Sequence, residues 1–213
     1  MECRKLIFEH LAESLSIEQV AGIDEVGRGA LFGPVVAAAV ILPQIAVLPL
    51  AEAGLTDSKR LKPLQRQVLA TQIQALAIDC RIGVASVAEI DRLNILQAAL
   101  LAMQRAIARL QPQPQLCLID GNQRLPQLQI PQQTLVKGDQ KSLVIAAASV
   151  VAKVWRDRLM IRLAKRYPGY GLEAHKGYGT AQHRQALQQL GVSRQHRLSF
   201  SPCQIDSLPN CNA

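Results

Sequence analysis

The chain has 213 residues, of which 49% are hydrophobic, and its 24 Lys and Arg against 16 Asp and Glu give a net charge of +8. This length suits one domain whose core needs no disulfide or structural metal, and the composition excludes a disordered chain. Excess positive charge favours an anionic partner, first of all nucleic acid, although it also serves solubility.

In chain order, strand-like and helix-like patterns alternate. Residues 19–26 and 34–42 are rich in Val, Ile and Ala and predict two buried strands joined by a Gly-rich turn. Residues 56–77 then become helical, with Pro63 suited to a first helical position. The side chains expected to face inward from this helix are Leu64, Val68, Leu69, Ile73 and Leu76.

The pattern continues with a strand at 80–87 and one long amphipathic helix at 88–110, followed by strands that stop at Gly121 and Gly138. A second long helix is expected at 142–167 and a last one at 180–190. Two initial strands followed by strand–helix alternation predict an α/β domain with a mixed sheet, in which the later strands pair in parallel.

The cysteines and histidines show no pattern of a disulfide framework or a zinc site. The five cysteines are scattered without a C-x-x-C pair, and the four histidines lack paired ligand spacing. Polar residues interrupt the N-terminal segment, and prolines break the apolar run at 35–50. We therefore expect a cytoplasmic protein without membrane contact.

Four acids stand where predicted strands end or loops begin: Asp24, Glu25, Asp120 and Asp139. Sites in open α/β sheets form outside the carboxyl ends of the strands, so parallel neighbours would bring these carboxylates together. Converging carboxylates raise one another's pKa unless a cation lies among them, and a set of oxygen ligands suits Mg²⁺ or Mn²⁺. Two such ions about 3.5–4 Å apart can activate water and stabilise the leaving oxygen in phosphodiester hydrolysis.

Structural roles compete for some of these acids. Asp120 begins an Asp-Gly-Asn turn, and Asp139 could cap the following helix. The adjacent pair of Asp24 and Glu25 is harder to explain structurally, because consecutive strand residues face opposite sides and a buried charge is costly. Both could reach one site only where the strand ends or bulges, and Gly27 and Gly29 suggest an end.

The same glycines invite comparison with a dinucleotide-binding fingerprint, which we reject. Position 32 is Phe, Gly33 comes one residue late, and Pro34 with a β-branched run follows instead of a helix. Bare backbone at this turn is better explained by close approach to a sugar–phosphate chain.

Seven ordered blocks, spread from about residue 20 to 202, closely resemble bacterial ribonuclease HII, the type 2 ribonuclease H. They are GIDEVGRGALFGPVVAAAV, LTDSKRL, LNILQAALLAMQRA, LIDGN, VKGDQKSLVIAAASVVAKVWRDRLM, GLEAHKGYGT and HRLSF. The resemblance implies a ribonuclease H-like fold with a five-stranded mixed sheet flanked by helices. It implies an endonuclease that hydrolyses the RNA strand of RNA–DNA hybrids and cuts 5′ to single ribonucleotides in duplex DNA, leaving 3′-hydroxyl and 5′-phosphate ends.

The resemblance also implies a site. Its metal-binding acids correspond to Asp24, Glu25, Asp120 and Asp139, its reader of the ribose 2′-hydroxyl to Gly27, Arg28 and Gly29, and its junction tyrosine to Tyr178. The 2′-hydroxyl is the group that distinguishes RNA from DNA, which agrees with a bare turn beside the acids. Tyr178 could equally be a tyrosine at the core edge. The candidate phosphate contacts, each also explicable as a solvated surface charge, are Lys59, Lys176, Arg60, Lys141 and Lys153.

The expected organisation is an N-terminal extension at 1–18, a catalytic domain at 19–202 and a loose C-terminal tail at 203–213. We expect a monomer that binds RNA–DNA hybrid or ribonucleotide-containing duplex and needs Mn²⁺ or Mg²⁺. Asp157, which lies in the same block as Asp139, is not expected to bind metal but to pair with Lys153 one helical turn away. The alternatives are a junction resolvase on the same fold and a non-catalytic nucleic-acid-binding protein.

Overall fold

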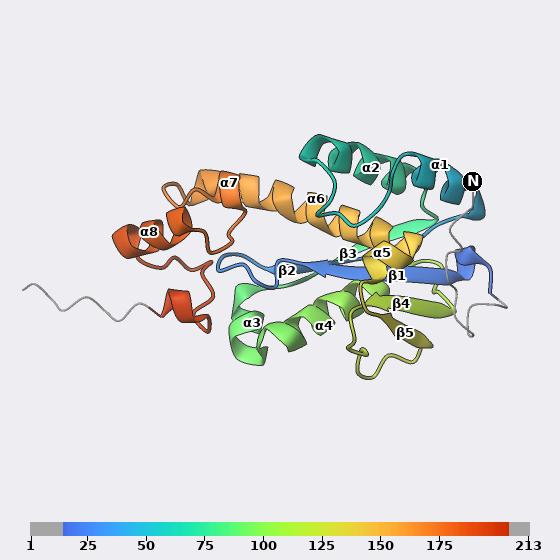
Figure 1. Ribbon diagram of the computed structural model, residues 1–213. Helices are drawn as coiled ribbons and strands as arrows, with labels where there is room; N and C mark the ends of the chain where they lie inside the picture. The colour runs from blue at the N-terminus through green and yellow to red at the C-terminus, as the bar shows by residue number, and fades with distance from the viewer. Residues whose placement is uncertain (1–14, 205–213) are drawn as a thin grey trace, which may run out of the picture.

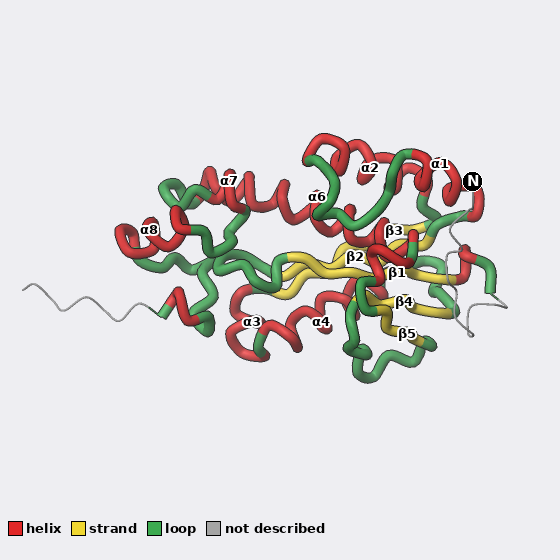
Figure 2. Tube along the Cα trace, viewed as in Figure 1, coloured by secondary structure: helices red, strands yellow, loops and turns green. Residues whose placement is uncertain are grey.

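The computed structural model describes residues 15–204, which build one five-stranded mixed sheet with helices on both faces (Figures 1 and 2). The strand order is β3-β2-β1-β4-β5. β2 lies antiparallel to both β1 and β3, whereas β4 is parallel to β1 and β5 is parallel to β4. The bounds are Val20–Val26 for β1, Val35–Ile41 for β2, Asp79–Ala85 for β3, Leu116–Asp120 for β4 and Gln132–Leu135 for β5. The predicted mixed sheet with parallel later strands is confirmed.

Helices cover the two faces unequally. The 24-residue α6 (Leu143–Arg166) lies on one face together with α1 (Gln44–Glu52) and α2 (Pro63–Leu76). α3 (Val87–Leu93) and α4 (Ile95–Ile107) lie on the other face (Figure 1). Every residue of β2 is buried, because both of its faces are covered.

Two glycines let the long helices approach the sheet closely. A Cβ atom placed on Gly22 of β1 would lie 2.1 Å from the carbonyl carbon of Val144 in α6. One placed on Gly83 of β3 would lie 1.9 Å from the carbonyl oxygen of Ala102 in α4. Each helix therefore packs its backbone directly on a strand, which only a residue without a side chain permits.

Beyond the end of the sheet, the C-terminal half of α6 packs with α7 (Leu172–His175), α8 (Ala181–Leu190) and the 27–34 loop. Phe32 is fully buried in this separate hydrophobic cluster, edge-on to both Tyr167 and His196. The loop after β1 is thus packed on this small hydrophobic cluster. It leads into β2 and not into a helix. Rejection of the dinucleotide fingerprint is confirmed.

The prediction of a single helix at 88–110 is wrong, because two helices, α3 and α4, occupy this range. Asn94 has φ 71° and ψ 165°, which breaks the chain into α3 and α4. Its side-chain oxygen accepts a hydrogen bond from the backbone N–H of Gln97, at 3.1 Å, and so caps α4. Asparagine tolerates positive φ better than most residues, so Asn94 was a signal for the break. The apolar pattern continues across it and instead favoured one helix.

The inward stripe expected for α2 is also partly wrong. Leu64, Val68 and Leu76 are exposed, and Leu69 and Ile73 are buried with Arg66 and Ala70. The guanidinium of Arg66 donates to the carbonyl of Ser58, which a sequence pattern of apolar residues could not anticipate. The short helices α1, α5 (Gly138–Lys141) and α7 were not expected either.

The expected extension at 1–18 and tail at 203–213 lie mostly outside the described residues, which begin at 15 and end at 204. Within the described part, Ile17 joins the core and Cys203 is buried in a 3₁₀ turn at Ser201–Cys203. None of the helices in residues 15–204 is long and apolar enough to cross a membrane.

Gly22→Ala is expected to destabilise the protein by roughly 1–3 kcal/mol, because α6 must shift to admit one methyl group. The melting temperature should fall by about 2–4 °C for each kcal/mol of lost stability in a chain of this size. Gly29→Ala is the matched control, since a Cβ atom there meets nothing within 4 Å. Equal melting temperatures for the two variants would contradict the close packing of α6 on β1.

Candidate active site

The four predicted acids lie around one end of the sheet. β1 pairs with β4 up to Ile23 and Ile119, so Asp24 and Asp120 are the next residues of two neighbouring parallel strands. Asp139 comes from α5, which follows β5 and precedes α6. Together they border a cavity of about 400 Å³, lined by Asp24, Glu25, Val26, Ser58, Lys59, Asp120, Asp139, Ser149, Lys153 and Tyr178. The expected convergence of the carboxylates is confirmed.

Asp24 and Glu25 share this cavity although they leave the strand on opposite sides. Asp24 is buried on the α6 side, where the Ser149 hydroxyl faces it. Glu25 also lines a smaller cavity with Arg28 and residues of α4. β1 keeps a regular register with β2 through Val26, so there is no bulge. Both acids reach one site because the pairing of β1 with β4 has ended.

Burial and mutual repulsion raise the pKa of several of these carboxyl groups. Burial, then the charges of Glu25 and Asp120, holds the pKa of Asp24 well above its usual value. Burial also raises the pKa of Glu25, against the opposing effect of Arg28, whose guanidinium donates to Oε1 at 3.1 Å. The pKa of Asp139 is raised to about 6 by burial and by Asp57 and Asp120. The nearby cations, among them Arg28 and Lys59, therefore do not fully offset burial and the repulsion among the carboxylates.

Asp120 and Asp139 are held by local structure that sequence patterns suggested only in part. The carboxylate of Asp120 accepts a 2.7 Å hydrogen bond from the N–H of Gly138, which ties β4 to α5. Gly121 has φ 93°, so the Asp-Gly-Asn turn exists and the acid still faces the cavity. Asp139 does not cap α6, because Ser142 is the N-terminal cap residue of that helix. The turn and the site are compatible explanations of Asp120.

A fifth acid, Asp57, was not predicted. It is 7% exposed, and its carboxylate accepts hydrogen bonds from the N–H of Lys59 at 2.9 Å and the amide of Gln140 at 3.4 Å. The neighbouring Ser58 accepts from the Ser149 hydroxyl at 2.9 Å. The block LTDSKRL indicated Lys59 and Arg60 but not Asp57, because only the fold brings residues 57–59 against α5 and α6.

The donor set fits a divalent cation that prefers oxygen. Carboxylates line the cavity without a His or Cys, and the raised pKa values show that the cluster would gain from a positive charge. Within residues 15–204, however, no three His, Cys, Asp or Glu side chains stand at the mutual spacing of a ready-made metal centre. An ion in this cavity would therefore require the carboxylate side chains to rotate towards one another.

Two buried arginines, which were not predicted, hold the glycine–arginine–glycine loop. Arg156 of α6 donates to the carbonyls of Phe32, Pro34 and Lys176 at 3.0, 3.2 and 3.0 Å. Arg197 donates to the carbonyls of Gly33 and Arg28 at 2.9 and 2.8 Å. Both side chains are 0% exposed. The loop owes its shape to these bonds, and Gly27 has no room for a Cβ because Arg156 Nε would lie 2.2 Å away.

Tyr178 is placed between the acids and this loop. Its backbone forms a bridge with Ala30, and its ring lies 5.5 Å from the guanidinium carbon of Arg156 and 5.9 Å from Nζ of Lys153. The ring lines the acidic cavity and is half-buried, so it is accessible and not only a residue of the core edge. Its carbonyl accepts from Nδ1 of the buried His183 at 3.0 Å.

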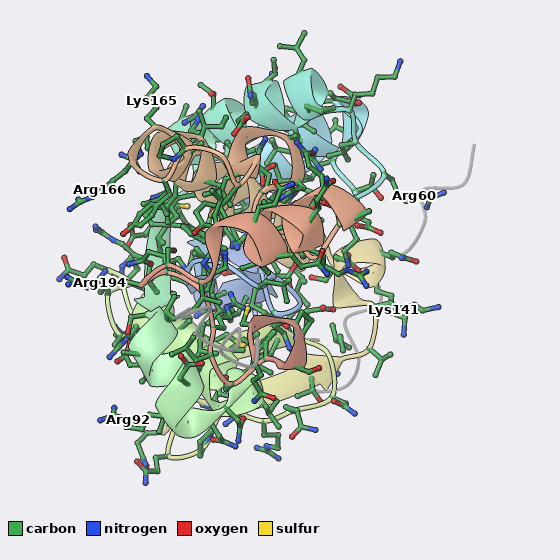
Figure 3. All side chains as sticks on the ribbon, turned by 90° about the vertical axis from the view of Figure 1, so that its left-hand side faces the viewer. Arg60, Arg92, Lys141, Lys165, Arg166 and Arg194 are labelled. Carbon is green, nitrogen blue, oxygen red and sulfur yellow. The ribbon has the colours of Figure 1, made fainter. Side chains whose placement is uncertain are left out.

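The basic candidates divide into two groups. Lys59 and Lys153 line the cavity, and Lys153 also pairs with Asp157 at 2.7 Å, as expected for positions one turn apart. Lys176 does not line it, since its ammonium donates to the carbonyl of Glu173. Arg60 and Lys141 point outward on the side of the molecule that carries α5 (Figure 3).

Comparison with known proteins points in one direction. Residues 21–203 match the family model described as ribonuclease HII. The chain is 63% identical over 193 residues to the ribonuclease HII of Acaryochloris marina, a match that covers 91% of this chain and 98% of the relative.

Solved structures share the fold. The ribonuclease H2 of Pyrococcus horikoshii OT3 superposes with a TM-score of 0.73 at 26% identity, covering 87% of this chain and 95% of that one. A structure of Bst-RNase HIII in complex with Mn²⁺ gives a TM-score of 0.72 at 23% identity, covering 91% and 70% of the two chains.

In metal-free buffer, Asp139→Asn is expected to stabilise the protein at pH 7.5 by roughly 1 kcal/mol, a few degrees in melting temperature, after allowance for solvent screening. A folded-state pKa of about 6 lies above the unfolded value, so the ionised group opposes folding above pH 6. The gain should shrink as the pH falls from 6 towards 4, where wild-type Asp139 becomes protonated.

Asp157→Asn serves as the comparison, measured by the same thermal unfolding series. It removes the ion pair with Lys153 and should cost at most about 0.5 kcal/mol, with no gain at pH 7.5. A loss of stability in Asp139→Asn across the whole pH range would contradict the repulsive cluster.

Proposed function

The chain belongs to the ribonuclease HII family, and on that premise we propose that Asp24, Glu25, Asp120 and Asp139 bind the divalent metal of its active site. The activity itself is that of ribonuclease HII: the enzyme cleaves the RNA strand of RNA–DNA hybrids and cuts DNA duplexes at embedded ribonucleotides. The observation that carries the assignment of residues is the shared 400 Å³ cavity, where buried carboxyl groups with raised pKa values meet without a cationic partner for each.

The proposed metal is Mn²⁺ or Mg²⁺. Mn²⁺ accompanies Bst-RNase HIII in its solved structure, and all four proposed ligands offer only oxygen. Such ions lower the pKa of water and neutralise charge on the phosphate during hydrolysis. The chain's own contribution is to hold four carboxylates on two strand ends and on α5. Asp57 accepts hydrogen bonds from Lys59 and Gln140, and the Ser149 hydroxyl lies beside Asp24. Lys59 and Lys153 supply positive charge for a phosphate.

We further propose that Gly27, Arg28, Gly29 and Tyr178 recognise the ribose next to the cleaved bond. The loop presents bare backbone beside Glu25, and Tyr178 offers a flat ring between this loop and the acids. Backbone groups at close range can read the 2′-hydroxyl, which DNA lacks. The cut then falls on the 5′ side of the ribonucleotide and leaves 3′-hydroxyl and 5′-phosphate ends. Lys176 can add a phosphate contact only after leaving its bond to Glu173.

The remaining proposals concern the setting of the enzyme. A nucleic-acid substrate places the enzyme where DNA is replicated and repaired, so we propose the cytoplasm as its location and a monomer as its state. A four-way DNA junction included in the cleavage assay would separate this activity from that of a resolvase.

Asp24→Asn should lower cleavage of a duplex with one ribonucleotide by more than about 100-fold, beyond what loss of an outer-sphere contact costs. The measurement compares initial rates with Mn²⁺, with Mg²⁺ and with EDTA, and EDTA should abolish cleavage by the wild type. Unfolding curves serve as the control for folding, because Asn keeps the size of Asp. Wild-type rates in the variant would mean that the metal lies elsewhere.

Gly29→Ala should slow cleavage at a single ribonucleotide by at least about tenfold, with the melting temperature unchanged. The added methyl group meets no atom of the protein within 4 Å, so any effect arises against the substrate. Kinetics on the single-ribonucleotide duplex, with melting curves alongside, test this. Unchanged kinetics would remove the glycine–arginine–glycine loop from sugar recognition.

A further inference from the structure

The outer face of α6 carries a row of cations with one aromatic side chain. Trp155, Arg158, Arg162 and Arg166 are spaced by three, four and four residues, so they lie on one stripe of the helix. The stripe is about 17 Å long at 1.5 Å per residue. A hollow of about 460 Å³ opens on it, lined by Trp155, Arg158, Ile161 and Arg162. We call these residues, together with Arg166, the α6 stripe.

The charge of this stripe has no internal compensation. Asp157 is the only acid between residues 153 and 166, and it is bound to Lys153. Within residues 15–204, Arg158, Arg162 and Arg166 form no ion pair and are exposed. Like charges four residues apart cost about 0.2–0.5 kcal/mol per pair in a helix. Two such pairs therefore weaken α6 slightly.

The helix dipole does not explain the stripe. Cations are stabilised within the last turn of a helix, which accounts for Lys165 and Arg166. Arg158 and Arg162 lie one to two turns before the end and gain little from the dipole. Trp155, the only tryptophan of the chain, is half-buried beside them, although solubility would require no aromatic group. An aromatic ring among arginines is the combination that nucleic acids contact, through phosphates and through stacking.

The stripe is separate from the catalytic cavity but on the same helix. Lys153 of α6 lines the cavity, and at 100° per residue Trp155 points about 160° away from it. Figure 3 shows Lys165 and Arg166 extending outward on the side opposite to Arg60 and Lys141. A duplex centred on the acids must therefore extend beyond the Lys141 side of the molecule before it can reach the stripe.

We propose that the α6 stripe is a second nucleic-acid contact surface, which binds the backbone of the substrate duplex outside the cleavage site. This inference rests on the proposed function for the identity of its ligand. Arg158 and Arg162 bind phosphates, and Trp155 packs against the adjoining sugar or base. The surface adds affinity on long substrates and takes no part in the reaction.

Trp155 allows a direct test, because its fluorescence reports on this surface alone. The full chain carrying Asp24→Asn, to prevent cleavage, is titrated with duplexes that contain one ribonucleotide. One duplex has four base pairs on each side, and two others extend by about twenty base pairs on the 5′ or the 3′ side only. The α6 stripe faces about 160° away from Lys153, so a duplex with only four base pairs on each side of the acids does not extend round the helix to Trp155, Arg158 and Arg162. One of the extended duplexes should change the emission of Trp155, and the short duplex should not.

Arg158→Ala with Arg162→Ala should then weaken binding of that extended duplex about tenfold or more and lower its salt slope by about 2. Affinity for the short duplex should stay within twofold. Arg92→Ala with Arg109→Ala removes the same charge from exposed positions of α3 and of the residues after α4 and should leave both affinities unchanged. Constant Trp155 emission with every duplex, or equal losses in the two double variants, would overturn the proposal. Failure of the wild type to cut any of the three duplexes would instead refute the proposed function.

Discussion

The repulsion among carboxylates at one end of the sheet is the constraint on which the rest of the site depends. Asp24 is buried where β1 leaves β4, and Glu25, Asp120 and Asp139 surround the same cavity. Their charges oppose one another and Asp24 is buried, so this arrangement costs folding energy instead of contributing to it. A protein maintains such a cluster only where the surrounding structure is rigid enough to impose it, and here the two parallel strands and α5 impose it through the bond from Gly138 to Asp120.

The loop beside the acids is held by buried cations without carboxylate partners, whereas the acids form a cluster of like negative charges. Arg156 and Arg197 are fully buried cations that donate to backbone carbonyls, and no carboxylate lies in a salt bridge with either among the described residues. Burial lowers the pKa of both guanidinium groups, that of Arg197 to about 9. Nη2 of Arg197 is buried without a hydrogen-bond partner in the described part of the chain. Such cost is consistent with a loop whose backbone must keep one shape, since several carbonyls pinned by one planar group cannot move independently.

One helix connects these two features. α6 packs its N-terminal half on β1, supplies Ser149 and Lys153 to the acidic cavity, and then places Arg156 under the loop. Because all three contributions come from one rigid helix, the distance between the acids and the glycine–arginine–glycine loop is set by helix geometry. Gly22 brings the start of this helix against the strand that carries Asp24, so packing in the core also positions the site.

The sequence by itself determined the elements with strong apolar patterns and the candidate acids. β1 and β2 were predictable from runs of Val, Ile and Ala, α6 was predictable from its long apolar segment, and Asp24 beside Glu25 stood out as charge in an apolar run. The break at Asn94 escaped because the apolar pattern continues across it, although the Asn itself was a usable signal. The inner face of α2 was predicted only in part, because the apolar pattern did not indicate that Arg66 is buried.

Only the tertiary structure decided which of the remaining polar residues belong to the site. Asp57, Ser58 and Ser149 come together across about ninety positions of the chain, and Arg197 reaches the carbonyl of Arg28 across an even longer span. A one-dimensional pattern records spacing within an element but not which elements meet. It likewise could not separate Lys59, which lines the cavity, from Lys176, which turns back onto its own backbone. For an exposed lysine that choice depends on side-chain rotamers and neighbouring carbonyls, which the fold alone brings within reach.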